Sequence, residues 1–312
     1  MPVFDQILQL AAKEGARRGL PTGYHHKSSK HERDVSPGLD DSQTSECELL
    51  VELDMRMTCD EWKELKGESS STGKRSSIYG SVRKWSMPIH YYYDGHFEFW
   101  EKREVRGAID DIEATTCISF KETVASDNSV SHKIKFADGK GCSSWVGMKY
   151  QHQEITLNPN CRRKGVVIHE ILHALGSLHE QERTDRDKYV TVHVENIDKD
   201  ALHNFDTYKT PPMLNYDIPY DYNSIMHYGQ YWFTSNGKPV LTTKDSAYQD
   251  VIGQRRGLSF LDIRTMNAFY NCVPPDDCGL TDCPGEGFVD KDCQCVCGIE
   301  NIGKTIMQLC GK

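Results

Sequence analysis

The feature that most constrains this chain is the run HEILHALGSLHE at residues 169–180. The stretch that ends at Gly176 has the pattern of a helix with a C-terminal glycine cap. His169 and His173 then lie one turn apart on the same helix face, at the separation of two metal ligands. Because Gly176 allows the chain to turn back, His179 can supply a third ligand. The fold must therefore place the three histidines around one point, two from a helix and one from the loop that follows it.

Three neutral imidazoles leave a fourth position for water, and bound zinc lowers the pKa of that water from 15.7 to about 7. Glu170 follows His169 directly, so its carboxylate lies beside the metal and suits a general base. The alternative is a helix whose histidines merely pack or face solvent. The five fixed positions arise by chance in a chain of this length with a probability on the order of 10⁻⁵. We therefore predict one zinc ion per chain, with Glu170 as the base in peptide-bond hydrolysis.

Length and charge narrow the possible partners. A chain of 312 residues is expected to hold one sizeable domain and smaller flanking pieces. Its net charge of −9 gives no reason to expect nucleic acid as a partner. No apolar run approaches the roughly 18 residues that a membrane span requires.

The cysteines indicate an oxidising compartment. The chain has 12 of them, and six lie between Cys278 and Cys310. A cytosolic protein rarely carries so many thiols, so we expect a secreted protein. The first twenty residues contain no apolar segment of signal-peptide length, and we expect the start of the gene product to be missing from this sequence.

Composition divides the chain into four parts. Residues 1–46 are polar and are expected to be a poorly ordered leader, and residues 47–75 a propeptide that ends at the exposed dibasic pair Lys74-Arg75. We expect a protease domain at 76–273 and a cysteine-rich module at 274–312, joined by a hinge in PPDD.

The coarse secondary structure of the protease domain mixes strands and helices. MPIHYYY, CISF, HKIKF, SSWVGM and QEITL are short strand candidates, and Lys164–Leu175 is the best helix in the chain. An earlier helix carries an apolar face of Val105, Ala108, Ile109 and Ile112. Residues 181–272 are expected to be mostly irregular and to close with a helix near Leu261–Tyr270.

The motif pattern resembles a known family. HExxHxxGxxH followed by a methionine turn is the metzincin pattern, and SIMHYG at Ser224–Gly229 supplies the turn. The longer run HEILHALGSLHEQERTDRD, with GCSSWVG, PYDYNSIMHY and IGQRRGLS, resembles the astacin family of zinc metalloendopeptidases from about Ser76 to Cys272. The resemblance implies an α+β fold, a two-lobed protease domain with a mixed twisted sheet and an active-site helix.

The same resemblance implies roles for single residues. Met226 would form an apolar floor beneath the imidazoles, although a lone methionine is usually core filler. Tyr228 would be a further zinc ligand that swings away to stabilise the oxyanion. Glu180 would pair with the new N-terminal ammonium after a cut behind Arg75, which makes Trp85 the tenth mature residue. The alternative for Glu180 is an ordinary surface glutamate.

Further implied features concern latency and cross-links. VELD at residues 51–54 resembles the propeptide motif Phe-x-Gly-Asp, whose aspartate, here Asp54, binds zinc in place of water; Val51 and Leu53 depart from that motif. Cys59 either offers a thiolate to zinc or pairs with Cys47. The resemblance also places the disulfides Cys117–Cys272 and Cys142–Cys161.

Three expectations complete the prediction. The tail resembles an EGF-like module, with a cysteine metal cluster as the alternative. QEITL would be the edge strand on which an extended peptide pairs. Arg255 or Arg256 would lend positive charge to the pocket beyond the scissile bond.

The sequence therefore predicts a secreted zinc endopeptidase made as a zymogen. Its partners would be protein or peptide substrates, with an extracellular partner for the EGF-like tail, and no nucleic acid. The rival is a catalytically inactive secreted binding protein on a zinc protease scaffold. Glu170 and Tyr228 separate the two hypotheses, because only catalysis requires them.

Overall fold

The structure is a computed structural model that describes residues 47–52, 54–67, 82–208, 218–272, 278–280, 283–285, 287–301 and 304–310. The predicted leader at 1–46, the dibasic pair Lys74-Arg75, the mature N-terminus at Ser76 and the hinge at 274–277 lie outside these ranges. Within them, no helix combines the length and apolar character that crossing a bilayer would need.

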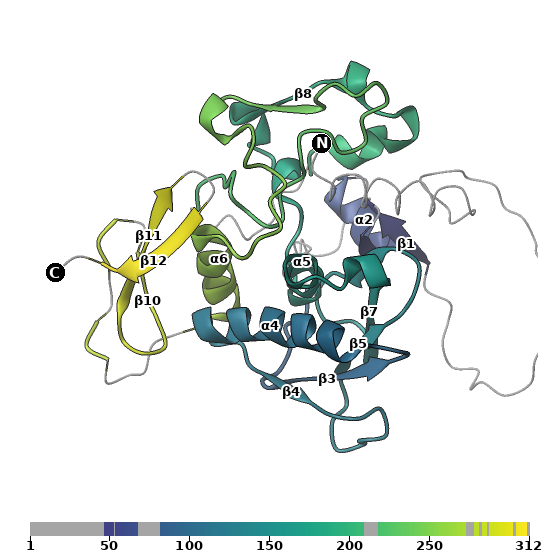
Figure 1. The fold of residues 1–312 in the computed structure, drawn as a ribbon, viewed down its shortest axis with the longest axis vertical. Coiled ribbons are helices and arrows are strands. Elements are labelled where there is room, and N and C mark those ends of the chain that lie inside the picture. Colours follow the sequence, from purple (N-terminus) through teal and green to yellow (C-terminus); the bar gives the residue numbers. More distant parts are fainter. Residues whose placement is uncertain are drawn as a thin grey trace, which may run out of the picture.

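A seven-stranded sheet with the order β1-β2-β6-β7-β5-β3-β4 underlies one lobe (Figure 1). Five strands follow residue 82 and are β3 (Ile89–Asp94), β4 (Phe120–Glu122), β5 (Lys133–Ala137), β6 (Cys142–Trp145) and β7 (His152–Leu157). The other two, β1 (Glu48–Val51) and β2 (Met55–Thr58), form an antiparallel hairpin. We call it the propeptide hairpin, because the sequence predicts a propeptide at residues 47–75. Parallel and antiparallel pairs both occur, because β6 runs against β7 while β7, β5, β3 and β4 run together. The sheet is mixed, as the resemblance implies.

The prediction that QEITL is an edge strand is wrong. These residues lie in β7, which pairs with β5 on one side and with β6 on the other. The buried run Ile155–Leu157 agrees with an interior strand, since a strand covered on both faces is apolar without alternation. The open edge of the protease sheet belongs to β6, and β2 of the propeptide hairpin occupies it in parallel.

Two long helices pack against the sheet and against each other, α4 (Phe99–Thr115) and α5 (Lys164–Leu175). The α4 face that the sequence predicts is buried, with Val105, Ala108, Ile109 and Ile112 at 0% exposure. Every residue of α5 from Gly165 onward is buried. The first α5 amide, on Lys164, donates to the Glu104 carboxylate of α4 at 2.8 Å. The helix ends at Gly176, whose φ of 114° is left-handed and favours glycine.

The second lobe is built mainly from turns, as the sequence predicts for residues 181–272. Its regular strands are the short pair β8 (Val190–Val192) and β9 (Leu241–Thr243). Helix α6 (Phe260–Tyr270) closes this region, and α2 (Cys59–Leu65) follows the propeptide hairpin. The 3₁₀ turns are η1 (Pro159–Cys161), η2 (Glu180–Glu182), η3 (Arg186–Lys188), η4 (Val194–Asn196), η5 (Lys199–Phe205) and η7 (Ser246–Tyr248).

All twelve cysteines form disulfides. Cys117 pairs with Cys272 and Cys142 with Cys161, which are the pairs that the family resemblance implies. Cys47 pairs with Cys59 and closes the propeptide hairpin, so Cys59 offers no thiolate to a metal.

The tail forms a three-stranded sheet of β10 (Phe288–Val289), β11 (Cys295–Asn301) and β12 (Lys304–Leu309) beside α6 (Figure 1). Its disulfides are Cys278–Cys293, Cys283–Cys295 and Cys297–Cys310, so no thiol remains for a cysteine metal cluster. Phe288 lies 5.6 Å from the Phe260 ring of α6, and Val296 joins the same apolar cluster.

A substitution at Gly165 tests how closely helix α5 approaches the backbone at Arg255. A Cβ at Gly165 would lie 1.7 Å from the Arg255 carbonyl oxygen, and backbone cannot move aside cheaply. We expect Gly165→Ala to lower the free energy of unfolding by about 1–3 kcal/mol, the usual cost of overpacking. At an unobstructed helix position, the same change from Gly to Ala would raise the free energy of unfolding by about 0.5–1 kcal/mol. The direction of the change therefore shows whether Gly165 is closely packed.

Denaturant unfolding of the purified chain measures this difference. Gly257→Ala is the matched control, because a Cβ there meets nothing within 4 Å, and it should stay within about 0.5 kcal/mol of the parent. Equal stability of the two variants would contradict the close packing described here.

Candidate active site

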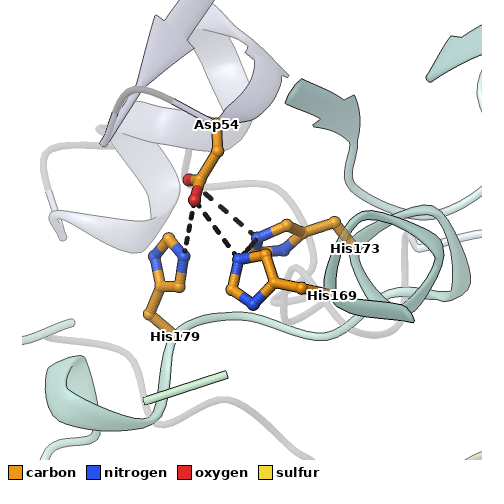
Figure 2. Close-up of side chains that lie close together, drawn as sticks. All are labelled: Asp54, His169, His173 and His179. Atoms are coloured by element: carbon orange, nitrogen blue, oxygen red, sulfur yellow. Dashed lines mark hydrogen bonds and ion pairs between the residues drawn. The ribbon is translucent and has the colours of Figure 1, made fainter. Parts of the chain in front are cut away.

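Helix α5 and the loop behind it bring three imidazoles together. His169 and His173 project from one face of α5, and the turn at Gly176 returns the chain so that His179 faces them (Figure 2). The Nε2 atoms of His169 and His173 are 3.1 Å apart, and the His179 ring centroid lies 4.8 Å from that of His173. All three side chains are buried.

The other nitrogen of each ring is already engaged. His169 Nδ1 donates to the Ile225 carbonyl at 2.9 Å, and His173 Nδ1 to the Ser177 carbonyl at 2.8 Å. His179 Nδ1 donates to Glu52 Oε2 at 2.6 Å. Because each Nδ1 carries the proton, each Nε2 presents a lone pair toward the same point. Lone pairs this close repel unless a cation lies between them, so the donor set fits a metal.

Asp54 reaches the same point from the tip of the propeptide hairpin (Figure 2). Its Oδ2 lies 3.2 Å from His169 Nε2 and 3.3 Å from His179 Nε2, and its Oδ1 lies 3.9 Å from His173 Nε2. The four side chains form a group that could hold a metal ion, with their ligand atoms within 4.8 Å of one another. Imidazole nitrogens and one carboxylate oxygen are ligands that zinc takes in proteins.

Charges in the site suit metal binding. Burial, followed by the charge of Arg255, lowers the pKa of His169 to about 4, and burial also lowers that of His173. These rings are therefore neutral, as metal ligands must be. Burial alone would raise the pKa of Asp54, but the three histidines outweigh it and hold that pKa well below its usual range. Burial lowers the pKa of His179, yet Asp54 and Glu52 together raise it to about 9. The carboxylates thus favour a positive charge where the Nε2 atoms meet, which is a proton on His179 in metal-free protein and a metal ion when one is bound.

Glu170 is 1% exposed on α5, and its Oε2 has no hydrogen-bond partner within the described part of the chain. Burial and then the negative charge of Asp54 raise its pKa well above the usual value, which Arg255 partly offsets. A carboxyl with a raised pKa and a free oxygen next to a metal-ligand group suits proton transfer.

The methionine turn is held by α6. The Asp262 carboxylate accepts hydrogen bonds from the Ser224 hydroxyl at 2.6 Å and from the Ile225 amide at 2.9 Å. Ile225 in turn accepts the proton of His169 Nδ1. Met226 follows and is 3% exposed in the main core. Asp262 was not among the predicted site residues, although SFLD at the start of α6 is a capping-box signal.

Tyr228 lies against the third imidazole. Its ring centroid is 4.6 Å from that of His179, and its hydroxyl donates to the Glu52 carbonyl at 3.0 Å. The hydroxyl is therefore engaged by the propeptide hairpin and not by the imidazole cluster.

Glu180 accepts hydrogen bonds from the Asp221 amide at 2.8 Å and from Arg183 at 3.1 Å. Burial raises its pKa to about 7, against the lowering effect of Arg183. It is therefore no ordinary surface glutamate. Its pairing with a mature N-terminus stays a prediction, because Ser76 lies outside the described residues.

Of the two arginines near residue 255, only Arg255 faces the site. Its guanidinium lies over the Trp232 ring at 4.8 Å and donates to the His227 carbonyl at 3.1 Å, and its Nη2 has no partner within the described ranges. Arg256 is exposed. Arg255 therefore supplies the positive charge felt by both Glu170 and Asp54.

Residues 77–271 match the family model for Astacin (Peptidase family M12A). The chain belongs to the astacin family. It is 37% identical over 253 residues to protein SpAN of Strongylocentrotus purpuratus, covering 78% of this chain and 41% of that protein. It is 33% identical over 250 residues to meprin A subunit alpha of Rattus norvegicus, covering 80% of this chain and 32% of that protein.

A solved structure agrees with the sequence relatives. High choriolytic enzyme 1 of Oryzias latipes, a hatching enzyme zinc-protease, superposes with a TM-score of 0.56 at 34% identity, covering 62% of this chain and 96% of that chain. The astacin-type domain here is thus a zinc metallopeptidase domain. The chain spans less than half the length of the curated relatives named above.

Metal analysis tests the site directly. The purified chain should contain one zinc per molecule, and His173→Ala should lose it because one of three converging donors is removed. His96→Ala is the control, since the His96 side chain is exposed and contacts Glu98, while its contact with Arg162 uses the backbone carbonyl that alanine keeps. Equal zinc content in the two variants, or full peptidase activity in metal-free protein, would refute the assignment.

Proposed function

We propose that this chain is a secreted zinc endopeptidase made as a zymogen, which acts on protein or peptide substrates. The observation that carries this proposal is the propeptide hairpin, whose Asp54 carboxylate lies on three converging imidazoles. A binding protein that has lost catalysis has no need of such a block. Glu170 and Tyr228 are both present, which also weighs against the inactive rival.

His169, His173 and His179 would hold the zinc ion. When bound, zinc polarises the scissile carbonyl and lowers the pKa of water from 15.7 to about 7. Glu170 accepts the proton of the attacking water and passes it to the leaving amine. The Tyr228 hydroxyl, once released from the propeptide, donates a hydrogen bond to the developing oxyanion. Met226 and the Asp262-bound turn keep His169 in place beneath.

Three contacts of one hairpin account for latency. Asp54 fills the position that water and substrate need, and the Ser144 amide of β6 donates to the Asp54 carbonyl at 2.7 Å. Arg56, two residues on, donates to the Thr156 hydroxyl of β7 at 2.8 Å. The hairpin thus blocks both the metal group and the edge of β6, on which an extended substrate would pair once the hairpin leaves.

Several finer points belong to the same proposal. The domain boundaries are 47–75 for the propeptide, 76–273 for the protease and 274–312 for an EGF-like module. Twelve paired cysteines support secretion. The pairing of the tail cysteines, first with third, second with fourth and fifth with sixth, supports a compact module that offers an extracellular partner a surface. Arg255 favours acidic side chains in the pocket beyond the scissile bond.

The N-terminal sequence of the activated protein tests whether activation follows cleavage after Arg75. Edman sequencing of the activated chain should begin at Ser76, because processing proteases cut after dibasic pairs in polar loops, and Lys74-Arg75 is such a pair in a polar stretch of the sequence. Glu180→Gln should then lower the melting temperature of the mature form and leave that of the zymogen nearly unchanged, since the new ammonium pairs only after the cut. A mature chain that starts beyond Trp85 would refute both the site and the pairing.

Glu170→Gln separates catalysis from metal binding. Gln keeps the shape but cannot accept a proton, so kcat of the activated enzyme should fall by at least about 10²–10⁴-fold. Zinc content and melting temperature should stay near those of the parent. Tyr228→Phe removes one hydrogen bond to the oxyanion and should cost about 10²–10³-fold. Turnover of one peptide and bound zinc are measured on the same samples. Near-parental turnover of Glu170→Gln with zinc in place would show that the base is another group.

A further inference from the structure

The imidazole of His179 depends on the propeptide in a way that the other two do not. His169 and His173 donate their Nδ1 protons to carbonyls of the protease domain, Ile225 and Ser177. His179 donates to Glu52, which lies two residues before Asp54 in the segment removed on activation. A metal-bound histidine almost always donates its second nitrogen to a carboxylate or carbonyl. Removal of the propeptide would therefore leave His179 without its acceptor.

Glu52 is placed for this contact by the hairpin. Its side chain has 0% exposure, and its φ of 54° puts the backbone in the left-handed region, which non-glycine residues rarely adopt. Its second oxygen accepts from the Tyr208 hydroxyl at 3.3 Å, and its carbonyl accepts from Tyr228. One propeptide residue thus contacts three groups around the third imidazole.

A second carboxyl already lies beside this pair. Glu182 is 0% exposed and is the last residue of η2, the 3₁₀ turn that begins directly after His179. One of its oxygens lies within 4.8 Å of both a His179 ring nitrogen and a Glu52 carboxylate oxygen. Neither Glu182 oxygen makes a well-aligned hydrogen bond within the described part of the chain, although the Glu52 carboxyl and the Tyr208 hydroxyl lie beside it. A buried carboxyl without a well-aligned acceptor or donor is costly, and the departure of Glu52 would leave His179 as a partner for it.

We propose that His179 exchanges its carboxylate partner on activation, from Glu52 in the zymogen to Glu182 in the mature enzyme. The proposal rests on the zymogen function proposed above. Glu182 is then a positioning residue: in the mature enzyme it fixes the tautomer and the orientation of His179 and strengthens it as a ligand. The exchange keeps a carboxylate behind the third ligand in both states. It also couples that change to the release of the Tyr228 hydroxyl, because both bonds end on Glu52.

The test compares zinc release from zymogen and from mature enzyme. Parent, Glu182→Ala, Glu182→Gln and the control Glu195→Gln are each studied before and after limited tryptic activation, with a zinc chelator in competition. Loss of an outer-shell partner typically weakens metal binding by 10–100-fold. We expect that loss for mature Glu182→Ala, a smaller one for Glu182→Gln, whose amide oxygen still accepts, and no change for Glu195, which is exposed. The Glu182 zymogens should bind zinc like the parent, because Glu52 still holds His179.

The reciprocal variant is Glu52→Gln. Its zymogen should release zinc faster, whereas its mature form has lost residue 52 and must match the parent. Equal weakening of zymogen and mature Glu182→Ala would overturn the exchange and indicate a merely structural residue. Parental zinc binding in mature Glu182→Ala would overturn it as well. If Glu182→Ala does not fold, Glu182→Gln and Glu52→Gln decide. Failure of the zymogen function itself gives a different result, because the parent would then lack zinc or peptidase activity after activation.

Discussion

The structure depends on holding three imidazole lone pairs at one buried point. Two Nε2 atoms 3.1 Å apart repel in the absence of a cation, and burial excludes the water that would otherwise separate them. The surrounding fold must therefore oppose that repulsion. It does so by placing α5 in the middle of the core, with no exposed face from Gly165 onward, so that the helix carrying His169 and His173 cannot rotate. The backbone contact between Gly165 and Arg255 fixes the start of the same helix.

The groups that accept hydrogen bonds from the three Nδ1 atoms show which other parts of the chain hold the imidazoles in place. His169 is oriented by Ile225, whose amide is held by Asp262 of α6, and α6 in turn packs against the tail through Phe260. His173 is oriented within its own turn by Ser177. His179 lies beyond the helix and takes its acceptor from the propeptide. Two of the three ligands, His169 and His179, are therefore oriented by distant parts of the chain, and His173 is oriented by its own turn.

Features that depend on residues close together in the chain were predicted correctly from the sequence. The helix at Lys164–Leu175, its end at Gly176 and the apolar face of α4 follow from periodicity and capping, and the structure agrees. Strand neighbours are set by contacts far along the chain, which is why QEITL was misplaced at the edge although its apolar run already indicated an interior strand. Glu52 and Glu182 carried no signal in a chain with 46 acidic residues, because only the fold brings them to His179. The cysteine pairs of the protease domain came from family resemblance and could not have come from spacing.

The proposed latency would depend on contacts that lie within a few residues of one another. Glu52, Asp54 and Arg56 are alternate residues around the tip of one hairpin, and they engage His179, the converging Nε2 atoms and strand β7 respectively. The Cys47–Cys59 disulfide joins the two ends of that hairpin and keeps its strands together. Parallel pairing with β6 covers only the register Met55–Ser144 and Arg56–Trp145, too short to hold the hairpin alone. Apolar packing adds to these contacts, because the buried side chains of Met55, Met57 and Leu65 share one cluster with Val82, Val146 and Phe269. In the proposed zymogen, the edge of β6, the metal group and Tyr228 therefore become free together when the hairpin leaves.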